Sequence, residues 1–392
     1  MMVDQKLFPQ DLLGQPPNQR LAYFRSLTIA HPSLCEAYEE LQWTIRDSAS
    51  GSLIFVQGPA GVGKTTLLRR VEQSLVQELL PELDDDTERV PVVRLTAVAS
   101  EANGFNWKDY FRRLLFALAE PMVDHKSRLI RSSEERNNDT KLALDPHATS
   151  ARLRYITEQA LGHRRPVAVL VDDAQHLAMI SSGRKLLDQL NTIKSIADLT
   201  HTTHVLVGTY ELTSFRNLSG QLSRRSTDIQ LMRYRVENRE ERQAFINVLW
   251  TFQQHLPLVE TPDLICDWDY FYERSIGCVG ILKDWLTRAL AVALRKGEET
   301  LKRRELNARA LSVAQCAKLL AESVEGERKL AETEESCRTL RRNLGLDTNG
   351  SCTKDTVPLR FDSEPISKPH KQKRNRVGRR NPVRDPIGAV NR

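Results

Sequence analysis

The stretch Gly58-Pro59-Ala60-Gly61-Val62-Gly63-Lys64-Thr65 decides the fold class of this 392-residue chain. It matches the phosphate-binding pattern G-x-x-x-x-G-K-[ST] without deviation. The short apolar run Leu53–Val56 comes before it, and the segment Thr66–Glu72, which has helical character, comes after it. The sequence therefore predicts a strand, a glycine-rich loop and a helix, which is the context that a phosphate-binding loop requires.

Each residue type in this loop has its own task in holding a nucleotide. Glycines let backbone N–H groups turn toward a phosphate, and the start of the following helix adds positive potential. Lys64 is expected to reach the β- and γ-phosphates, and Thr65 to offer its hydroxyl to Mg²⁺. The alternative is a glycine-rich turn with a surface lysine. We predict that ATP and Mg²⁺ are the cofactors, and that the binding residues are Gly58, Pro59, Ala60, Gly61, Val62, Gly63, Lys64, Thr65 and Thr66.

Two adjacent acids follow another apolar run. Val167–Val171 has the composition of a buried strand, and Asp172 and Asp173 come directly after it. Ligands bind at the carboxyl ends of strands in open α/β sheets. Asp172 is therefore predicted to hold Mg²⁺ through water, and Asp173 to orient or deprotonate the attacking water. Without the phosphate-binding loop, a solvated acidic turn would be the better interpretation.

Four further residues are candidates for contacting the nucleotide or its terminal phosphate. Thr209 ends the apolar run Val205–Gly208, and Lys283 lies in the first turns of a helix in the second half of the chain. Arg224 and Arg225 precede a faint fifth strand, where one of them would reach a neighbouring subunit's phosphate. The sequence does not separate these two arginines. The alternatives are an ordinary threonine at a strand end, a basic turn and an exposed helical lysine.

The composition bounds the class of protein. Hydrophobic residues make up 40% of the chain and charged residues 28%, and the net charge is +6 with a pI near 9.0. This charge favours a polyanionic partner. The first residues lack the apolar segment of a secretory signal, and no apolar run approaches the roughly 20 residues that cross a membrane. The six cysteines form no C-x-x-C pair and read as reduced thiols, which predicts a cytoplasmic protein without a metal site.

The chain divides into four predicted segments. Residues 1–50 form an N-terminal helical extension, and 51–235 alternate apolar runs with amphipathic stretches, which predicts an α/β domain with a parallel five-stranded sheet flanked by helices. Residues 236–344 are expected to be a small helical lid with further C-terminal helices. Residues 345–392 form a basic tail that we expect to be disordered. The predicted strands are Leu53–Val56, Val90–Leu95, Val167–Val171, His204–Val207 and Asp228–Leu231.

The order of these pieces resembles the AAA+ ATPases and, more narrowly, the TniB/TnsC group of transposition regulators. The resemblance covers roughly residues 20–295 and rests on Leu27–Trp43, GPAGVGKTTLL, VLVDDAQHL, VLVGTYEL, LSRRSTDIQL and SIGCVGILKDWL. The DDAQHL and IGCVGILKDWL elements are the ones that point to this narrower group. In one respect the chain departs from the pattern, because most AAA+ proteins have Asp-Glu where this chain has Asp172 and Asp173. Aspartate is one methylene shorter, so we expect nucleotide binding to survive and hydrolysis to be slow.

The resemblance implies a function that spacing alone does not. Members of the group bind ATP and assemble head-to-tail into homo-oligomeric rings or helical filaments on double-stranded DNA. They connect a target-selection protein, in some systems an RNA-guided CRISPR complex, to a transposase. The tail Arg360–Arg392, with ten lysines and arginines against three acids, would be a docking peptide for that transposase. The alternative for the tail is an electrostatic arm that contacts DNA.

Contact with DNA is expected to depend on phosphate groups and not on base sequence. The chain has no helix-turn-helix pattern and no zinc-finger spacing, so binding should be weakly sequence-dependent and strongly salt-dependent. A cluster of Lys108, Arg112 and Arg113 is the second choice, and a solvated basic face is the alternative for either set. The first-choice DNA contacts are Lys126, Arg128, Arg131, Lys141, Thr149 and Arg152.

Two other classes of function remain open from the sequence. A signalling or defence ATPase of the STAND type would switch protein effectors without DNA, but such chains normally append long repeat or effector domains. An initiator or helicase loader often carries a winged-helix domain after the lid, and residues 300–392 are too charged and too poor in strand signals for that. DNA-stimulated assembly would separate the DNA-bound classes from the signalling class.

Overall fold

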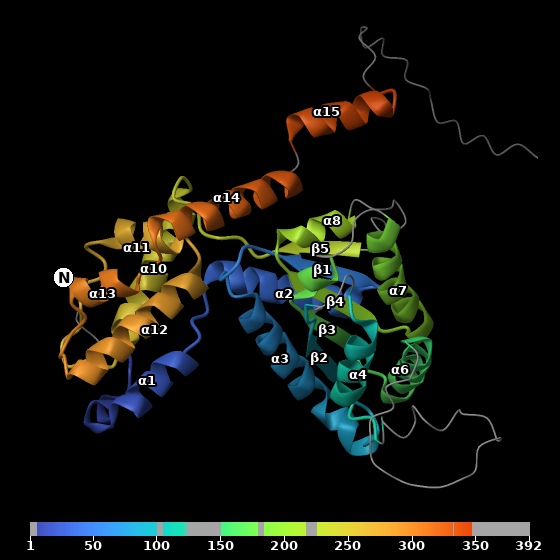
Figure 1. The fold of residues 1–392 in the computed structure, drawn as a ribbon, viewed down its shortest axis with the longest axis horizontal. Coiled ribbons are helices and arrows are strands. Elements are labelled where there is room, and N and C mark those ends of the chain that lie inside the picture. Colours follow the sequence, from blue (N-terminus) through green and yellow to red (C-terminus); the bar gives the residue numbers. More distant parts are fainter. Residues whose placement is uncertain are drawn as a thin grey trace, which may run out of the picture. The chain divides into compact units, whose positions relative to one another are not determined.

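The computed structural model describes residues 6–99, 105–121, 123, 150–178, 184–216, 226–331 and 333–346. Its centre is a five-stranded parallel sheet in the order β2-β3-β4-β1-β5 (Figure 1). This confirms the predicted fold class, that of the AAA+ P-loop ATPases, and each strand lies within two residues of its predicted run. The strands are β1 (Leu53–Gln57), β2 (Val92–Thr96), β3 (Ala168–Asp172), β4 (Thr203–Gly208) and β5 (Ser226–Gln230).

Helices cover both faces of the sheet (Figure 1). Side chains of a strand alternate between faces, so a sheet covered on both sides needs apolar residues at successive positions. In β1, Leu53 and Phe55 pack with α4 (Trp107–Ala117), α6 (Ser150–Arg164) and α7 (Arg184–Thr200). Ile54 and Val56 pack on the opposite face with α2 (Pro32–Asp47) and α3 (Lys64–Asp85). Each such side chain contributes roughly 1.5–3 kcal/mol on burial, which fixes the sheet between the two helical layers.

A second hydrophobic core lies among helices that follow the sheet. It is built from α10 (Arg239–His255), α11 (Trp268–Ser275), α12 (Val279–Lys296) and α13 (Arg303–Arg309), which together we call the lid. The Trp285 ring is fully buried, and its Nε1 donates a 2.8 Å hydrogen bond to the Leu306 carbonyl. Helix α1 (Pro17–Ser26) buries Phe24 in the same core against Phe252. The predicted N-terminal extension 1–50 is thus shared between two cores, because α2 packs on the sheet.

Shorter elements complete the described chain. They are η1 (Gln10–Gly14), η2 (Ala174–Leu177), η3 (Tyr210–Leu212) and α8 (Thr213–Arg216), with α14 (Val313–Leu330) following the lid. Residues 332–392 form a separate unit, in which α15 (Glu334–Asn343) begins with a capping box between Thr333 and Ser336. Residues 347–392, which hold nearly all of the predicted tail, lie outside the described residues. None of the described helices combines the length and apolarity needed to span a membrane.

One buried histidine makes the stability of the sheet depend on pH. His204 in β4 is 1% exposed, and its Nδ1 lies 3.0 Å from the Thr202 carbonyl oxygen. Burial lowers the pKa of His204 from 6.5 to about 4, because the charged ring would lose its hydration among the strands. The imidazole is therefore neutral in the folded protein at pH 7.

The free energy of unfolding is expected to fall as the pH drops from about 6.5 to about 4. In that window the unfolded chain binds a proton at His204 and the folded chain does not, which is worth up to about 3 kcal/mol at ~1.4 kcal/mol per pKa unit. Urea unfolding of His204→Asn should show a weaker pH dependence than the wild type. The exposed control His201→Asn should keep the full dependence, and equal slopes for both variants would contradict the assignment.

Candidate ATP-binding site

The glycines of the phosphate loop (Gly58–Thr65) occupy positions that other residues would not fit. Gly61 and Gly63 have φ values of +74° and +115°, in the left-handed region that favours glycine. A Cβ atom on Gly58 would lie 2.2 Å from the Leu231 carbonyl oxygen, at the end of β5. Helix α3 begins at Lys64, so its free N–H groups face the loop. The loop therefore presents backbone donors and a helix N-terminus to one space, which suits a phosphate.

Lys64 is held over this loop. Its Nζ donates hydrogen bonds to the carbonyls of Gly58 (2.9 Å) and Pro59 (2.7 Å). Burial lowers the pKa of Lys64 to about 8, and the charges of Asp172 and Asp173 oppose that fall. A phosphate oxygen is a stronger acceptor for an ammonium than a carbonyl is, so the side chain can exchange these bonds for a nucleotide.

The structure brings Thr65 and Asp172 together. Asp172 ends β3 and is 4% exposed, and its carboxylate accepts a hydrogen bond from the Thr65 side chain. Its Oδ1 also accepts a 3.0 Å bond from the Asp173 backbone N–H. Burial raises the pKa of Asp172, while the Thr65 bond acts to lower it. A hydroxyl next to a carboxylate is an oxygen ligand pair of the kind Mg²⁺ prefers, so these residues fit the predicted metal.

A glutamine connects Asp173 to the end of β4. Asp173 has a φ of +51°, and its Oδ1 accepts a 3.1 Å bond from the Gln175 side-chain amide. The other end of that amide, Oε1, accepts the Thr209 N–H at 3.4 Å. The Thr209 hydroxyl is buried and makes no hydrogen bond within the described part of the chain. An orphaned hydroxyl here fits a ligand oxygen or a water. The sensing role of Thr209 stays a prediction.

Gln175 was not among the residues predicted for the site. It lies within the quoted segment VLVDDAQHL, two residues after the acids. A side-chain amide can accept one hydrogen bond and donate another, so it can connect two neighbouring groups. An amide this close to the two acids is the signal that could have identified Gln175. Gly208 makes room for it, since a Cβ atom there would lie 2.4 Å from the Gln175 Oε1.

The lid touches the phosphate loop directly. The Ile281 N–H, in the first turn of α12, donates a 3.2 Å bond to the Gly61 carbonyl. A Cβ atom on Gly280 would lie 2.4 Å from the same oxygen, so glycine permits this approach. The phosphate loop and the first turn of α12 are therefore joined by a backbone hydrogen bond.

Lys283, two residues further along α12, is bonded to other groups. Its Nζ donates to the carbonyls of Arg25 (2.9 Å) and Leu27 (2.5 Å), at the C-terminal end of α1. The last carbonyls of a helix lack partners within the helix and attract cations. The predicted contact between Lys283 and a nucleotide stays a prediction, and it would require the exchange of these two bonds.

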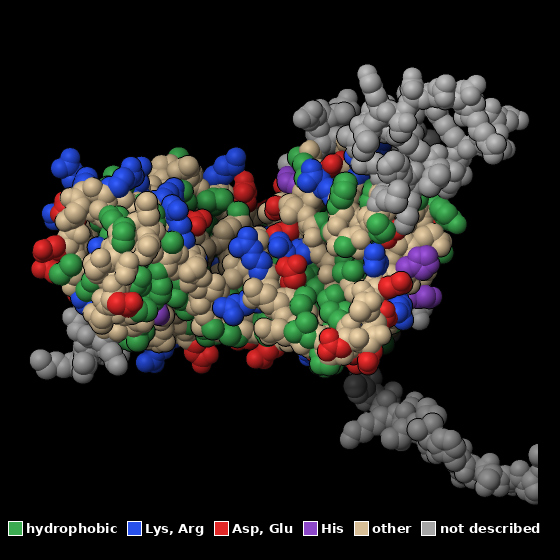
Figure 2. Space-filling view, turned by 90° about the horizontal axis from the view of Figure 1, so that it is seen from below, with side chains coloured by type: hydrophobic (Ala, Val, Ile, Leu, Met, Phe, Trp, Pro, Cys, Tyr) green, Lys and Arg blue, Asp and Glu red, His purple; other side chains and the backbone are tan. Residues whose placement is uncertain are grey.

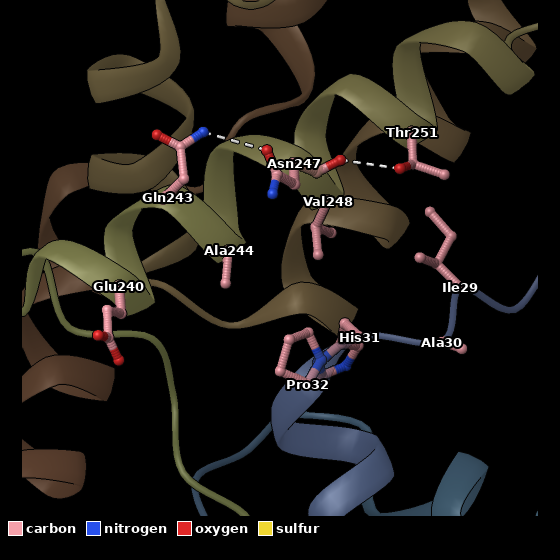
Figure 3. Close-up of a pocket in the computed structure, with 10 residues that line it drawn as sticks. All are labelled: Ile29, Ala30, His31, Pro32, Glu240, Gln243, Ala244, Asn247, Val248 and Thr251. Carbon is pink, nitrogen blue, oxygen red and sulfur yellow. Dashed lines mark hydrogen bonds between the residues drawn. The ribbon is translucent and has the colours of Figure 1, made fainter.

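Residues of the linker between α1 and α2 line two cavities of about 350 and 380 Å³. In the first, His31 and Pro32 face Glu240 and Ala244 of α10 (Figure 3). The His31 Nδ1 lies 2.9 Å from the Tyr234 hydroxyl, just beyond β5. Burial lowers the pKa of His31 to about 4, so the imidazole that contacts the Tyr234 hydroxyl is neutral at pH 7.

The predicted DNA contacts and arginine fingers lie mainly outside the described residues. Arg152 is described and half-buried in the first turn of α6, and the second-choice cluster lies on α4. There the Arg113 Nε makes a 2.6 Å ion pair with Asp109. On the face drawn in Figure 2, basic and acidic side chains are interspersed. The residues outside the description are Arg224, Arg225, Lys126, Arg128, Arg131, Lys141 and Thr149.

Comparisons with known proteins agree with this geometry. Residues 46–215 match the model of a family described as AAA domain. A comparison with curated proteins finds no match. The matched range contains the phosphate loop, the two acids and Thr209, so residues 46–215 are an AAA-type P-loop ATPase domain and the chain is an ATPase.

Several solved structures are similar to the chain. The ORC2 protein of Aeropyrum pernix, in ADPNP–ADP complexes, has 14% identity and a TM-score of 0.49, over 75% of this chain and 71% of that one. A Walker-type ATPase of Pyrococcus abyssi has 16% identity and a TM-score of 0.42, over 79% and 75%. The Aeropyrum pernix ORC1 protein in complex with DNA has 16% identity and a TM-score of 0.46, over 74% and 68%. These likenesses are too distant to assign a substrate or a partner.

Replacing Asp173 by asparagine should slow ATP hydrolysis by at least about tenfold and leave ATP affinity unchanged, because the amide cannot act as a base toward water. Asparagine tolerates the left-handed backbone at this position, so the fold should be kept. Single-turnover hydrolysis and binding of a fluorescent ATP analogue would measure the two quantities. Asp188→Asn on α7 is the matched control, and a wild-type rate in Asp173→Asn would assign water orientation to another group.

Proposed function

We propose that this ATPase oligomerises on double-stranded DNA when ATP is bound, and that it links a target-selection protein to transposase recruitment in DNA transposition. One observation carries the proposal. The two segments that distinguish the TniB/TnsC group, DDAQHL and IGCVGILKDWL, both meet the phosphate loop. Asp172 of the first accepts a hydrogen bond from Thr65, and the Ile281 N–H of the second donates a 3.2 Å bond to the Gly61 carbonyl. The elements that define the narrower resemblance thus lie at the predicted nucleotide site.

The residues of the site support a slow switch. Bound ATP with Mg²⁺ supplies a phosphoanhydride whose hydrolysis changes the charge at the loop. Lys64 and the loop amides bind the phosphates, and Thr65 and Asp172 hold Mg²⁺. Asp173, oriented by Gln175, positions the water. Since Asp173 is shorter than the usual glutamate, the ATP-bound state would be long-lived, which suits an assembly whose bound state matters more than turnover.

A neighbouring subunit would complete the site. Arg224 or Arg225 of the next copy would stabilise the terminal phosphate, because a guanidinium stays charged and binds phosphate oxygens in pairs. Assembly would then require ATP, and hydrolysis would loosen it. Such a head-to-tail contact repeats from copy to copy and gives rings or filaments.

The net charge of +6 supports a nucleic-acid partner. DNA would be held through phosphate contacts, with Arg152 and the neighbouring basic stretch as first choice, so affinity should fall steeply with salt. The basic tail Arg360–Arg392 has interspersed Pro, Val and Ile residues, as in Val377–Gly388, which favours a segment that folds on a protein partner. We assign it to the transposase.

Electron microscopy should show rings or filaments only when double-stranded DNA and a non-hydrolysable ATP analogue are both present. The variant Lys64→Ala, which removes the ammonium from the phosphates, should form none, whereas Lys318→Ala on the exposed side of α14 should behave as the wild type. Particles that stay monomeric, or that assemble regardless of DNA, would favour the signalling ATPase. Binding of the tail peptide to a transposase would then separate transposition from replication initiation.

A further inference from the structure

A buried arginine beside the phosphate loop has no role in the site described so far. Arg233 lies three residues after β5 and is 9% exposed. Its Nε lies 3.0 Å from the Glu327 Oε1, and one guanidinium nitrogen lies 3.5 Å from the Tyr272 hydroxyl. A buried guanidinium is costly unless it is paired, so Glu327 is the group that permits Arg233 to be here.

Two observations place Arg233 at the edge of the phosphate loop. The chain leaves β5 through Leu231, whose carbonyl approaches Gly58 so closely that only glycine fits. On the other side of Arg233, the Tyr234 N–H donates a 3.0 Å bond to the Gly277 carbonyl, just before α12. The chain that carries Arg233 is thus held between the phosphate loop and the start of α12.

The partner of Arg233 belongs to a helix that bridges lid and core. The first half of α14 packs on α11, where the Cys316 Sγ lies 3.5 Å from the Arg274 carbonyl. The second half packs on η3, and Gly326 lies against Tyr210, whose ring atoms would be 2.2 Å from a Cβ at that position. Glu327, next to Gly326, is the charged anchor of this second half.

Glu327 has a second arginine available. Its Oε2 lies 3.2 Å from a guanidinium nitrogen of Arg235, whose side chain is 41% exposed. If Arg233 turned away, the Glu327 carboxylate would keep this partner and could leave the core together with the helix. The buried guanidinium of Arg233, by contrast, has the Glu327 carboxylate as its counter-ion.

A cavity of about 270 Å³ lies between the second half of α14 and the phosphate loop. Pro59 and Ala60 line it from the loop, Ser323 and Gly326 from α14, and Thr209 and Tyr210 from the end of β4. The hydroxyls of Thr209 and Tyr210 are both buried and have no hydrogen-bond partner in the described residues. Buried polar groups without partners in a native protein call for a ligand or a water.

We propose that Arg233 senses the terminal phosphate of ATP, that it exchanges Glu327 for that phosphate, and that the exchange releases the second half of α14 from Tyr210. A phosphate carries more negative charge than a carboxylate and accepts two parallel bonds from a guanidinium. ADP lacks this group and leaves the Arg233–Glu327 pair intact. The inference rests on ATP binding at Gly58–Thr65 and is independent of the proposed role in transposition.

In this arrangement, the packing of α14 would depend on whether ATP or ADP is bound. Lys283, the lid cation expected over the nucleotide, instead donates to carbonyls of Arg25 and Leu27. Arg233, two residues after the Leu231 carbonyl that approaches Gly58, would supply the cation instead. Its switch in partner would loosen a helix that joins η3 to α11, and so would couple the phosphate to the lid.

Hydrogen exchange of the full chain tests the release of α14. With a non-hydrolysable ATP analogue, the backbone amides of residues 319–330 should exchange at least about tenfold faster than with ADP. Glu327→Gln should give the faster exchange without any nucleotide. The matched control is Glu325→Gln on the same helix, whose carboxylate pairs with Arg328 and Lys329 and not with Arg233 or Arg235, and it should leave exchange unchanged.

Two further variants separate the charge from the packing. Gly326→Ala should push α14 off Tyr210 and speed exchange without nucleotide, while keeping the preference for ATP over ADP.

Arg233→Gln should weaken binding of the ATP analogue at least about tenfold with ADP affinity unchanged, and Arg233→Lys should restore part of the loss. Retained ADP affinity reports that the loop is folded. Equal loss for both nucleotides, or equal α14 exchange with both, would overturn the proposal.

Discussion

The close approach of three strand ends at Gly58 is the constraint on which the rest of the site depends. The Gly58 N–H donates to the Gly208 carbonyl at 3.3 Å, and the Leu231 N–H donates to the Gln57 carbonyl at 2.8 Å. Strands β4, β1 and β5 therefore end together, as parallel strands of one sheet do. Thr209 and the phosphate loop follow these ends directly, and Arg233 lies three residues after β5. A sheet that lost this register would separate the groups that we propose to act on one phosphate.

The charged side chains at the carboxyl end of the sheet interact strongly because they are buried. Lys64, Asp172 and Arg233 are all largely removed from water, and each is bonded to another group of the protein. In a site of low dielectric, replacing one partner by another changes the energy of the neighbours strongly. The Ile281–Gly61 bond and the α14 contact with Tyr210 give such changes two routes into the lid. The arrangement suits a protein whose output is its conformation.

The part of the site that is local in sequence was predictable. The phosphate loop, the strand before it and the acids after β3 follow from short patterns, because neighbouring residues alone determine them. The roles of Gln175 and Arg233 could not be predicted in this way, since their partners Thr209 and Glu327 lie far along the chain. The direction of Lys283 depends on carbonyls more than two hundred residues away. The packing of α1 against the lid could not be predicted either, because it is a tertiary contact that no short sequence pattern indicates.

In the proposed function, the ATP-bound protein is the form that assembles on DNA. Thermodynamic linkage then requires DNA to raise the affinity for ATP by the same factor by which ATP raises the affinity for DNA. The most direct test titrates a fluorescent, non-hydrolysable ATP analogue into the protein with and without double-stranded DNA, at one fixed salt concentration. We expect clearly tighter binding of the analogue in the presence of DNA and little change for ADP. An affinity for the analogue that does not respond to DNA would contradict the account.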